Sequence, residues 1–269
     1  VDLSAVRDNV TALRALVAPA RMLAVVKADG YGHGAVPVSR AALEAGADGL
    51  GVALVEEGVQ LRDAGIDAPV LVLSEPVPAA AGVVVEHGLT PVVYTSTGIE
   101  ALAKAVAVSG RGMPLDVHLK VDTGMGRVGC RMEDAFELAA KVVGHSELRL
   151  AGTCTHFAVA DEPDNPYTQL QIDRFDTVLA MFRSANIAPG VAHACTTAGA
   201  LAYPAARYDL VRVGIGVYGV PPAPAPAGAV SLRPALSVKA RVAFVRTVPA
   251  QTRVSYGLRY ETDRETCIA

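Results

Sequence analysis

Lys27 and the loop that follows it carry the clearest signal for covalent chemistry in this 269-residue sequence. Lys27 ends the apolar run that begins at Met22, and the next seven residues read ADGYGHG. Three glycines in such a loop let the backbone approach a bound ligand closely. A lysine amine that is partly withdrawn from water has a lowered pKa, which suits bond formation to a carbonyl carbon. The pattern predicts a reactive amine at a strand end, although a lysine there is commonly just solvated.

Four later apolar runs also contain polar residues, three of them at the end of the run and one inside it. In the run at 118–127, an ordinary ion pair in a charged loop would account for Lys120 and Arg127. In the run at 152–157, His156 could be a structural residue. Thr197 and the threonine before it could simply cap a helix. Arg212 lies inside an apolar strand, where an unpaired charge is costly to bury, so a functional role is favoured. The runs are HLKVDTGMGR (118–127), GTCTHF (152–157), HACTT (193–197) and VRVGIGVYG (211–219).

The elements that must position these residues alternate between strand and helix. Such alternation predicts a parallel sheet, and eight units in about 220 residues favour a closed (β/α)8 TIM-like barrel over an open doubly wound sheet. In such a barrel the active site lies at the carboxyl ends of the strands. The predicted strands are Met22–Lys27, Leu50–Leu54, Val70–Leu73, Pro91–Tyr94, Leu115–Val121, Leu148–His156, Ala188–Cys195 and Leu210–Tyr218. The predicted helices are Ser4–Val17, Ala35–Ala45, Val55–Ala64, Ser96–Val108, Glu133–Val143 and Thr168–Ser184.

The sequence changes character after Tyr218. Residues 220–230 contain VPPAPAPAG and predict a stiff proline-rich linker between a barrel at 1–219 and the beginning of a C-terminal β domain at 231–269. The alternating pattern of Ala235–Val248 predicts an antiparallel strand. We expect the start of the original chain and the remainder of this β domain to be missing.

Composition excludes several classes of function. The net charge of -3 and the lack of a basic run argue against nucleic acid and acidic membrane surfaces as partners. No apolar stretch approaches the roughly 20 residues that a membrane span needs. The four cysteines are far apart, which indicates buried thiols in a reducing compartment, here the cytoplasm, and their spacing does not support a metal site.

The segment AVVKADGYGHG resembles the pyridoxal-phosphate lysine motif of alanine racemases, and this resemblance extends through nearly the whole chain. It implies that Lys27 holds pyridoxal 5'-phosphate covalently and is one of two catalytic bases. Tyr31 would then hydrogen-bond the cofactor phosphate. Arg127 would lie near the cofactor's phenolic oxygen and the substrate carboxylate, and Lys120 matches a supporting lysine that is often carbamylated in the family.

The remaining motifs resemble the same family. His156 would lie beside the cofactor ring, and Thr197 keeps a hydroxyl for the phosphate, although Thr196 replaces the usual asparagine and its role is open. Arg212 would face the pyridine nitrogen. Because an arginine keeps its proton, the ring nitrogen stays largely unprotonated and is a weaker electron sink, which suits a racemase. The amides of Gly214 and Ile215 would hold the phosphate.

Tyr256 completes the resemblance. A lone tyrosine in a β segment is normally part of a core, but VSYG (254–257) is similar to the segment that carries the family's second base. In the family this tyrosine reaches the site of the partner subunit, which implies an obligate homodimer. Lys27 would act on the hydrogen of D-alanine and Tyr256 on that of L-alanine, and the D-alanine formed would serve peptidoglycan synthesis.

Three alternatives remain open. A racemase of broader specificity, for serine or lysine, would use the same site. A non-catalytic barrel that binds pyridoxal phosphate would need the lysine and the phosphate cup but not Tyr256. A decarboxylase on the same barrel is disfavoured by Arg212, because a decarboxylase depends on the electron sink that an arginine weakens.

Overall fold

The structure is a computed structural model that describes residues 1–222 and 230–269. Most of the predicted linker, residues 223–229, lies outside the described residues. The described chain divides into two compact units, Val1–Leu236 and Ser237–Ala269, and each is described by itself. None of the helices in the described residues is long and apolar enough to cross a membrane.

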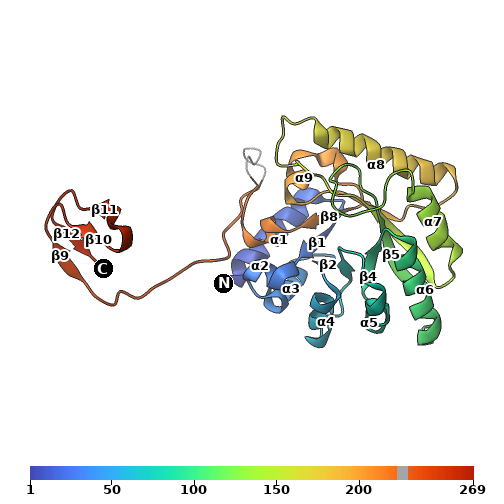
Figure 1. Cartoon of the computed structure of the whole chain (residues 1–269), viewed down its shortest axis with the longest axis horizontal. Helices are drawn as coiled ribbons and strands as arrows, with labels where there is room; N and C mark the ends of the chain where they lie inside the picture. The colour runs from blue at the N-terminus through green and yellow to red at the C-terminus, as the bar shows by residue number, and fades with distance from the viewer. Residues whose placement is uncertain (223–229) are drawn as a thin grey trace. The chain divides into compact units, whose positions relative to one another are not determined.

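The first unit contains an eight-stranded sheet in which all the paired neighbours are parallel (Figure 1). The edge strands meet, because the amide of Asp209 donates to the Ala192 carbonyl at 3.1 Å and the amide of Arg212 donates to the Cys195 carbonyl at 2.9 Å. The predicted (β/α)8 barrel is therefore confirmed. The strands are β1 (Arg21–Val25), β2 (Gly49–Val52), β3 (Val70–Val72), β4 (Thr90–Val93), β5 (Leu115–Lys120), β6 (Leu148–Cys154), β7 (Val191–His193) and β8 (Leu210–Val213).

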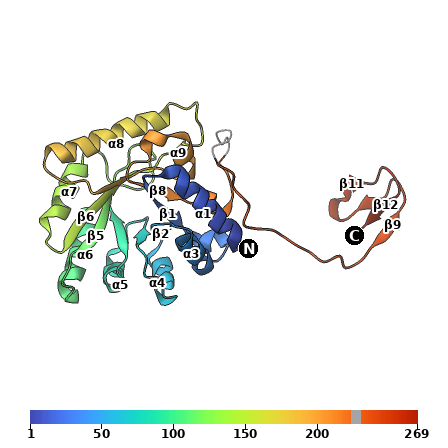
Figure 2. The same cartoon turned by 180° about the vertical axis from the view of Figure 1, so that it is seen from behind.

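Helices cover the outside of the barrel (Figures 1 and 2). In α6 the buried residues Ile99, Leu102, Ala103 and Val106 follow helical spacing and form one apolar face. The Thr95 side chain caps this helix by accepting from the amide of Gly98 at 3.0 Å. The helices are α1 (Leu3–Val17), α2 (Lys27–Gly32), α3 (Ala35–Glu44), α4 (Val55–Asp63), α5 (Ala81–Glu86), α6 (Ser96–Ser109), α7 (Ala135–Gly144), α8 (Tyr167–Ser184) and α9 (Thr197–Ala202), of which α2 is the short left-handed turn described below.

Apolar packing occurs on both sides of the sheet. The main core joins the outward faces of the strands to the helices, and it includes Met22, Ala24 and Val26 from the first strand and its end. A smaller cluster fills one side of the barrel interior with Leu23, Leu71, Val92, Cys154 and Leu210. The rest of the interior is polar, since His118, Lys120, His193 and Arg212 are all buried. Polar groups at this depth need partners, which the site described below supplies.

The last barrel strand is shorter than the sequence predicts. The predicted strand Leu210–Tyr218 ends at Val213, and Ile215–Tyr218 form a 3-10 turn, η3. Gly214 breaks the strand with φ -104° and ψ -94°. A short apolar run cannot distinguish a strand from a buried helical turn by periodicity, which explains this difference.

The segment after the undescribed residues first packs on the barrel. The side chain of Asn9 on α1 donates to the Arg233 carbonyl at 2.8 Å and accepts from the Arg233 amide at 2.7 Å. The amide of Ala235 donates to the Tyr218 carbonyl at 3.0 Å. These contacts explain why the first compact unit extends to Leu236.

The second unit contains two small antiparallel pairs. β9 (Arg246–Val248) pairs with β12 (Thr266–Ile268), and β10 (Arg253–Val254) pairs with β11 (Tyr260–Glu261). The prediction of a strand over Ala235–Val248 is wrong except at its last three residues. A strand needs a neighbour for its backbone hydrogen bonds, and the described residues provide one only from Arg246 onward.

Candidate active site

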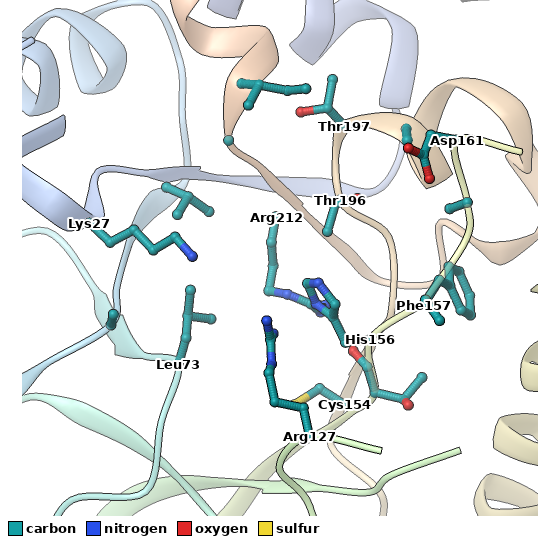
Figure 3. A pocket seen from close by; sticks show the side chains of 18 of the residues that line it. Lys27, Leu73, Arg127, Cys154, His156, Phe157, Asp161, Thr196, Thr197 and Arg212 are labelled. Carbon is teal, nitrogen blue, oxygen red and sulfur yellow. The ribbon is translucent and has the colours of Figure 1, made fainter. Parts of the chain in front are cut away.

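A cavity of about 710 Å³ lies at the carboxyl ends of the barrel strands. It is lined by four cationic residues and one carboxylate, that of Asp161, so it is suited to anionic ligands. Figure 3 shows the side chains of Lys27, Arg127 and Arg212 directed toward the same central space, with His156 beside Arg212. The residues predicted from the sequence that line it are Lys27, Tyr31, Lys120, Arg127, His156, Thr197, Arg212, Gly214 and Ile215.

A left-handed turn follows Lys27. Ala28, Asp29, Gly30 and Tyr31 have φ values of 51°, 51°, 61° and 52°, so four successive residues adopt the left-handed conformation. Three of them are not glycines, and such residues rarely occupy this region unless surrounding contacts hold them there. Strained backbone of this kind gathers at functional sites, and here it starts directly after the lysine that faces the cavity.

The turn is held by two carboxylates. Glu57 on α4 accepts from the amide of Ala28 at 2.6 Å and, with its other oxygen, from the amides of Ala53 at 2.7 Å and Leu54 at 3.1 Å. Asp29 accepts from the amide of Ala35 at 2.8 Å and so ties the turn to the start of α3. Glu57 was missed in the sequence, where its position three residues after a helix cap offered only a capping signal.

Arg212 is buried without a carboxylate partner among the described residues. Its Nη2 donates its two hydrogens to the carbonyl oxygens of Thr155 and Ala194, both at 2.8 Å, and lies 3.3 Å from Nδ1 of His156. Its Nη1 donates to Nδ1 of His193 at 2.6 Å. Burial lowers the pKa of Arg212, yet a guanidinium stays charged at neutral pH. The site therefore keeps a charged group in place with neutral acceptors alone.

His156 is held neutral next to this arginine. Burial, then the positive charge of Arg212, lowers the pKa of His156 to about 2. Since a guanidinium carries only N–H groups, an N–H on Nδ1 of His156 would face another N–H, and this contact favours the tautomer with the proton on Nε2. His156 thus offers an N–H donor on the side away from Arg212.

Lys120 is buried at the end of β5. Its Nζ makes one long hydrogen bond, to the Leu73 carbonyl at 3.4 Å. Burial lowers the pKa of Lys120, and the charges of Arg212 and Arg127 lower it further. The nearby loop that carries Arg127 is shaped by Asp122, whose carboxylate accepts from the amides of Gly124, Met125 and Gly126.

A small cradle lies at the start of η3. A Cβ atom on Gly214 would come within 2.7 Å of the Tyr31 hydroxyl, so the backbone and that hydroxyl approach each other closely. The Thr197 hydroxyl accepts from the Gly216 amide at 3.2 Å. Within the described ranges, the backbone amides of Gly214 and Ile215 donate no hydrogen bond to another protein group, so both are available to a ligand. Burial raises the pKa of Tyr31, so its hydroxyl keeps its proton and can donate a hydrogen bond. The Tyr31 hydroxyl and the two free amides together form the group of donors that a phosphate requires.

Tyr256 belongs to the second unit, in the turn Tyr256–Leu258, and its side chain is fully exposed. Thr196 lines the cavity, as its position next to Thr197 implies. Cys154 also lines it, a residue that the sequence did not indicate because buried thiols are common in cores.

Comparisons with known proteins identify the family. Residues 1–222 match the family model described as alanine racemase, N-terminal domain. Over its whole length the chain is 47% identical to the alanine racemase of Symbiobacterium thermophilum and 42% identical to that of Frankia casuarinae, and it covers 71% of each.

Solved structures agree. The alanine racemase of D-cycloserine-producing Streptomyces lavendulae is 40% identical with a TM-score of 0.89, and that of Streptomyces coelicolor A3(2) is 37% identical with a TM-score of 0.88. The matches cover 99% of this chain and 71% and 72% of those chains. The chain therefore belongs to the alanine racemases, a family of pyridoxal-phosphate-dependent enzymes.

Proposed function

We propose that this chain interconverts L-alanine and D-alanine with pyridoxal phosphate held on Lys27. The observation that carries the proposal is the cavity in which the Lys27 amine and the guanidinium groups of Arg127 and Arg212 meet beside a cradle of free donors. A substrate carboxylate, a cofactor phosphate and a phenolic oxygen are all anionic, and such a cavity stabilises them together.

The residues of the cavity fit this cofactor. Tyr31, Thr197 and the amides of Gly214 and Ile215 would hold its phosphate, and Arg212 would face its pyridine nitrogen. When bound, the cofactor withdraws electrons from the α-carbon of the amino acid, so that the hydrogen on that carbon can be removed. Arg212 limits this withdrawal, because a guanidinium keeps its protons at working pH and so leaves the pyridine nitrogen unprotonated.

The other residues orient the substrate and move its proton. Arg127 would bind the substrate carboxylate and the phenolic oxygen through parallel N–H donors. The Lys27 amine would take or return the hydrogen on the D-alanine face of the α-carbon. His156, held neutral by Arg212, would donate its Nε2–H toward the second base.

We propose Tyr256 of the partner subunit as the second base, and therefore a homodimer with shared sites. Full exposure of the Tyr256 side chain supports this, since a base used by another subunit cannot be buried in its own. The organisation expected from the sequence, a barrel at 1–219, a linker at 220–230 and a β domain at 231–269, here with its first residues packed on the barrel as far as Leu236, would let Tyr256 reach that site.

We propose that Lys120 carries a carbamate. Its amine nitrogen would attack CO2, form an N–C bond and release one proton, which leaves one negative charge in the cavity that contains Arg127. The lowered pKa of Lys120 supports the step, because only the neutral amine reacts. Protein equilibrated with 13C-labelled CO2 should give a carbamate carbon resonance that the Lys120→Arg variant lacks, and its absence from the parent would contradict the proposal.

The function is tested by incubating the purified holoenzyme with a panel of L-amino acids and separating the enantiomers on a chiral column. We expect D-alanine to form faster than any other D-amino acid. In the cytoplasm this D-alanine would supply peptidoglycan synthesis. Equal rates for serine or lysine would instead indicate a broader racemase. Cofactor bound at Lys27 without any D-amino acid would indicate a non-catalytic binding protein.

A further inference from the structure

Two histidines besides His156, His118 and His193, are buried inside the barrel beneath the active site. His118 and Lys120 are both buried and lie two positions apart on β5, so their side chains lie on the same face of the strand. Nδ1 of His118 lies 2.7 Å from Nε2 of His193, whose Nδ1 in turn accepts from Arg212 at 2.6 Å. The chain of contacts therefore connects the barrel interior to the arginine of the site. The proposed function gives His118 and His193 no role.

The barrel makes specific room for His118. A Cβ atom on Gly152 would lie 2.6 Å from Nδ1 of His118, so a larger residue at this position of β6 would displace the ring. The β5–β6 register also shifts between Val117 and His118. Strand irregularities of this kind re-aim side chains and occur next to active sites. The local strand geometry thus serves the placement of this imidazole.

The contact with Arg212 determines which nitrogen carries the proton in His193 and then in His118. A guanidinium cannot accept a hydrogen bond, so Nδ1 of His193 must be unprotonated and its proton must be on Nε2. That proton points at Nδ1 of His118, which must then be the acceptor. Neutral His118 carries its own proton on Nε2, at the edge of a lower cavity of about 450 Å³ that Arg21, Asp116 and Arg149 also line.

The neutral state of both rings agrees with their surroundings. Burial, opposed in part by Asp116, lowers the pKa of His118 to about 4, and burial with the charge of Arg212 lowers that of His193. A proton added to His118 would place an N–H against the N–H of His193. His193 could then accept from His118 only by moving its own proton to Nδ1, where it would face the N–H of Arg212.

We propose that His118 is a positioning residue: by accepting the Nε2 proton of His193 it fixes His193 as the acceptor that orients Arg212. The inference rests on the proposed function only in assigning Arg212 to the cofactor ring. The contact geometry and the tautomers are properties of this chain without the cofactor.

Two substitutions separate the hydrogen bond from the volume of the ring. His118→Asn places an amide oxygen near the position of Nδ1 and keeps an acceptor, whereas His118→Leu fills similar space without one. We expect His118→Leu to lower kcat for alanine by about tenfold, the effect of one lost hydrogen bond, with KM little changed. His118→Asn should recover most of that loss.

The tautomers are measured directly by 15N NMR of histidine-labelled protein, both cofactor-free and loaded. The six histidines are assigned by the signal lost in each single variant. We expect parent His193 to be protonated at Nε2 and unprotonated at Nδ1 at pH 7, and His118→Leu to populate both tautomers of His193.

Each result decides the proposal. Parent His193 protonated at Nδ1 would overturn it without any variant. An unchanged His193 spectrum and kcat in folded His118→Leu would also overturn it, as would equal losses in the Asn and Leu variants. A parent protein with the expected tautomers but no racemisation would refute the proposed function and leave the positioning of Arg212 intact.

Discussion

The carboxylate of Glu57 accepts a hydrogen bond from the amide of Ala28 at 2.6 Å, directly after the lysine that faces the cavity. Glu57 comes from α4, the helix after the second strand, so a neighbouring βα unit supports the left-handed turn at Lys27. The same carboxylate holds the end of β2 through Ala53 and Leu54. The two loops are therefore held by a single side chain.

Replacing Glu57 with glutamine should loosen this turn. The amide keeps one acceptor oxygen where the carboxylate uses two, so we expect a loss of about 1–2 kcal/mol in the free energy of unfolding. The amount of cofactor bound through Lys27 should also fall. Urea unfolding and absorbance titration with pyridoxal phosphate measure the two effects.

Glu56→Gln is the matched control, since Glu56 is the preceding, exposed residue on the same helix. It removes the same charge without touching the turn. Equal losses in the two variants would mean that net charge, and not the contact with Ala28, is responsible.

Lys27→Ala should abolish the covalent link to the cofactor. We expect loss of the imine absorbance near ~420 nm and a fall in racemisation of roughly 10³-fold or more, because one catalytic base is lost as well. Absorbance spectra and the enantiomer assay measure these. The control is Lys104→Ala, which removes an exposed amine on α6. Retention of the absorbance in Lys27→Ala would assign the cofactor to another lysine.

Tyr256→Phe should spare cofactor binding and selectively slow removal of the L-alanine hydrogen. In deuterated water, we expect exchange into D-alanine to continue while exchange into L-alanine falls by roughly 10²-fold or more. Mass spectrometry of the separated enantiomers reads both rates. Tyr260→Phe is the control, since Tyr260 is also exposed in the second unit.

Mixing two inactive variants tests whether the site is shared. Heterodimers of Lys27→Ala and Tyr256→Phe contain one site with both substitutions and one with neither, if Tyr256 serves the partner. Random exchange of equal amounts should then restore about one quarter of the parent sites, because half the dimers are mixed. No recovery after exchange would place both residues of a site in one subunit.

Folding stability should decline in mildly acidic solution. The pKa of His118 is about 4 in the fold and 6.5 for an exposed histidine, so as the pH falls the unfolded chain binds its proton first. Above pH 6.5 neither state is protonated and there is no penalty. As the pH falls from 6.5 to 4 the fold loses free energy, on the order of 3 kcal/mol from this group.

Urea midpoints at several pH values measure this loss. His118→Asn should show a smaller decline than the parent, whereas His87→Asn, which removes a half-buried surface histidine, should follow the parent. A parallel decline in parent and His118→Asn between pH 6.5 and 4 would show that other groups, such as His156, dominate.

Much of the fold was predictable because its signals are local. Apolar runs of strand length and helices with one apolar face are written in neighbouring residues, and their alternation implies a parallel barrel. The chemistry-bearing residues at the strand ends, such as Lys27 and Arg212, could be named for the same reason, since parallel strands bring their carboxyl ends to one face. The end of β8 at Val213 escaped prediction because its apolar run has no period that separates strand from turn.

By itself, then, the sequence determined the order of elements and the residue types at the mouth of the barrel. Tertiary structure alone decided the left-handed turn, which depends on Glu57 from another unit, and the line of contacts from His118 through His193 to Arg212. His118 and His193 are 75 positions apart along the chain, and His193 and Arg212 are 19 apart. Their contact depends on strand register and on the space left by Gly152, and neither quantity is encoded within a single segment.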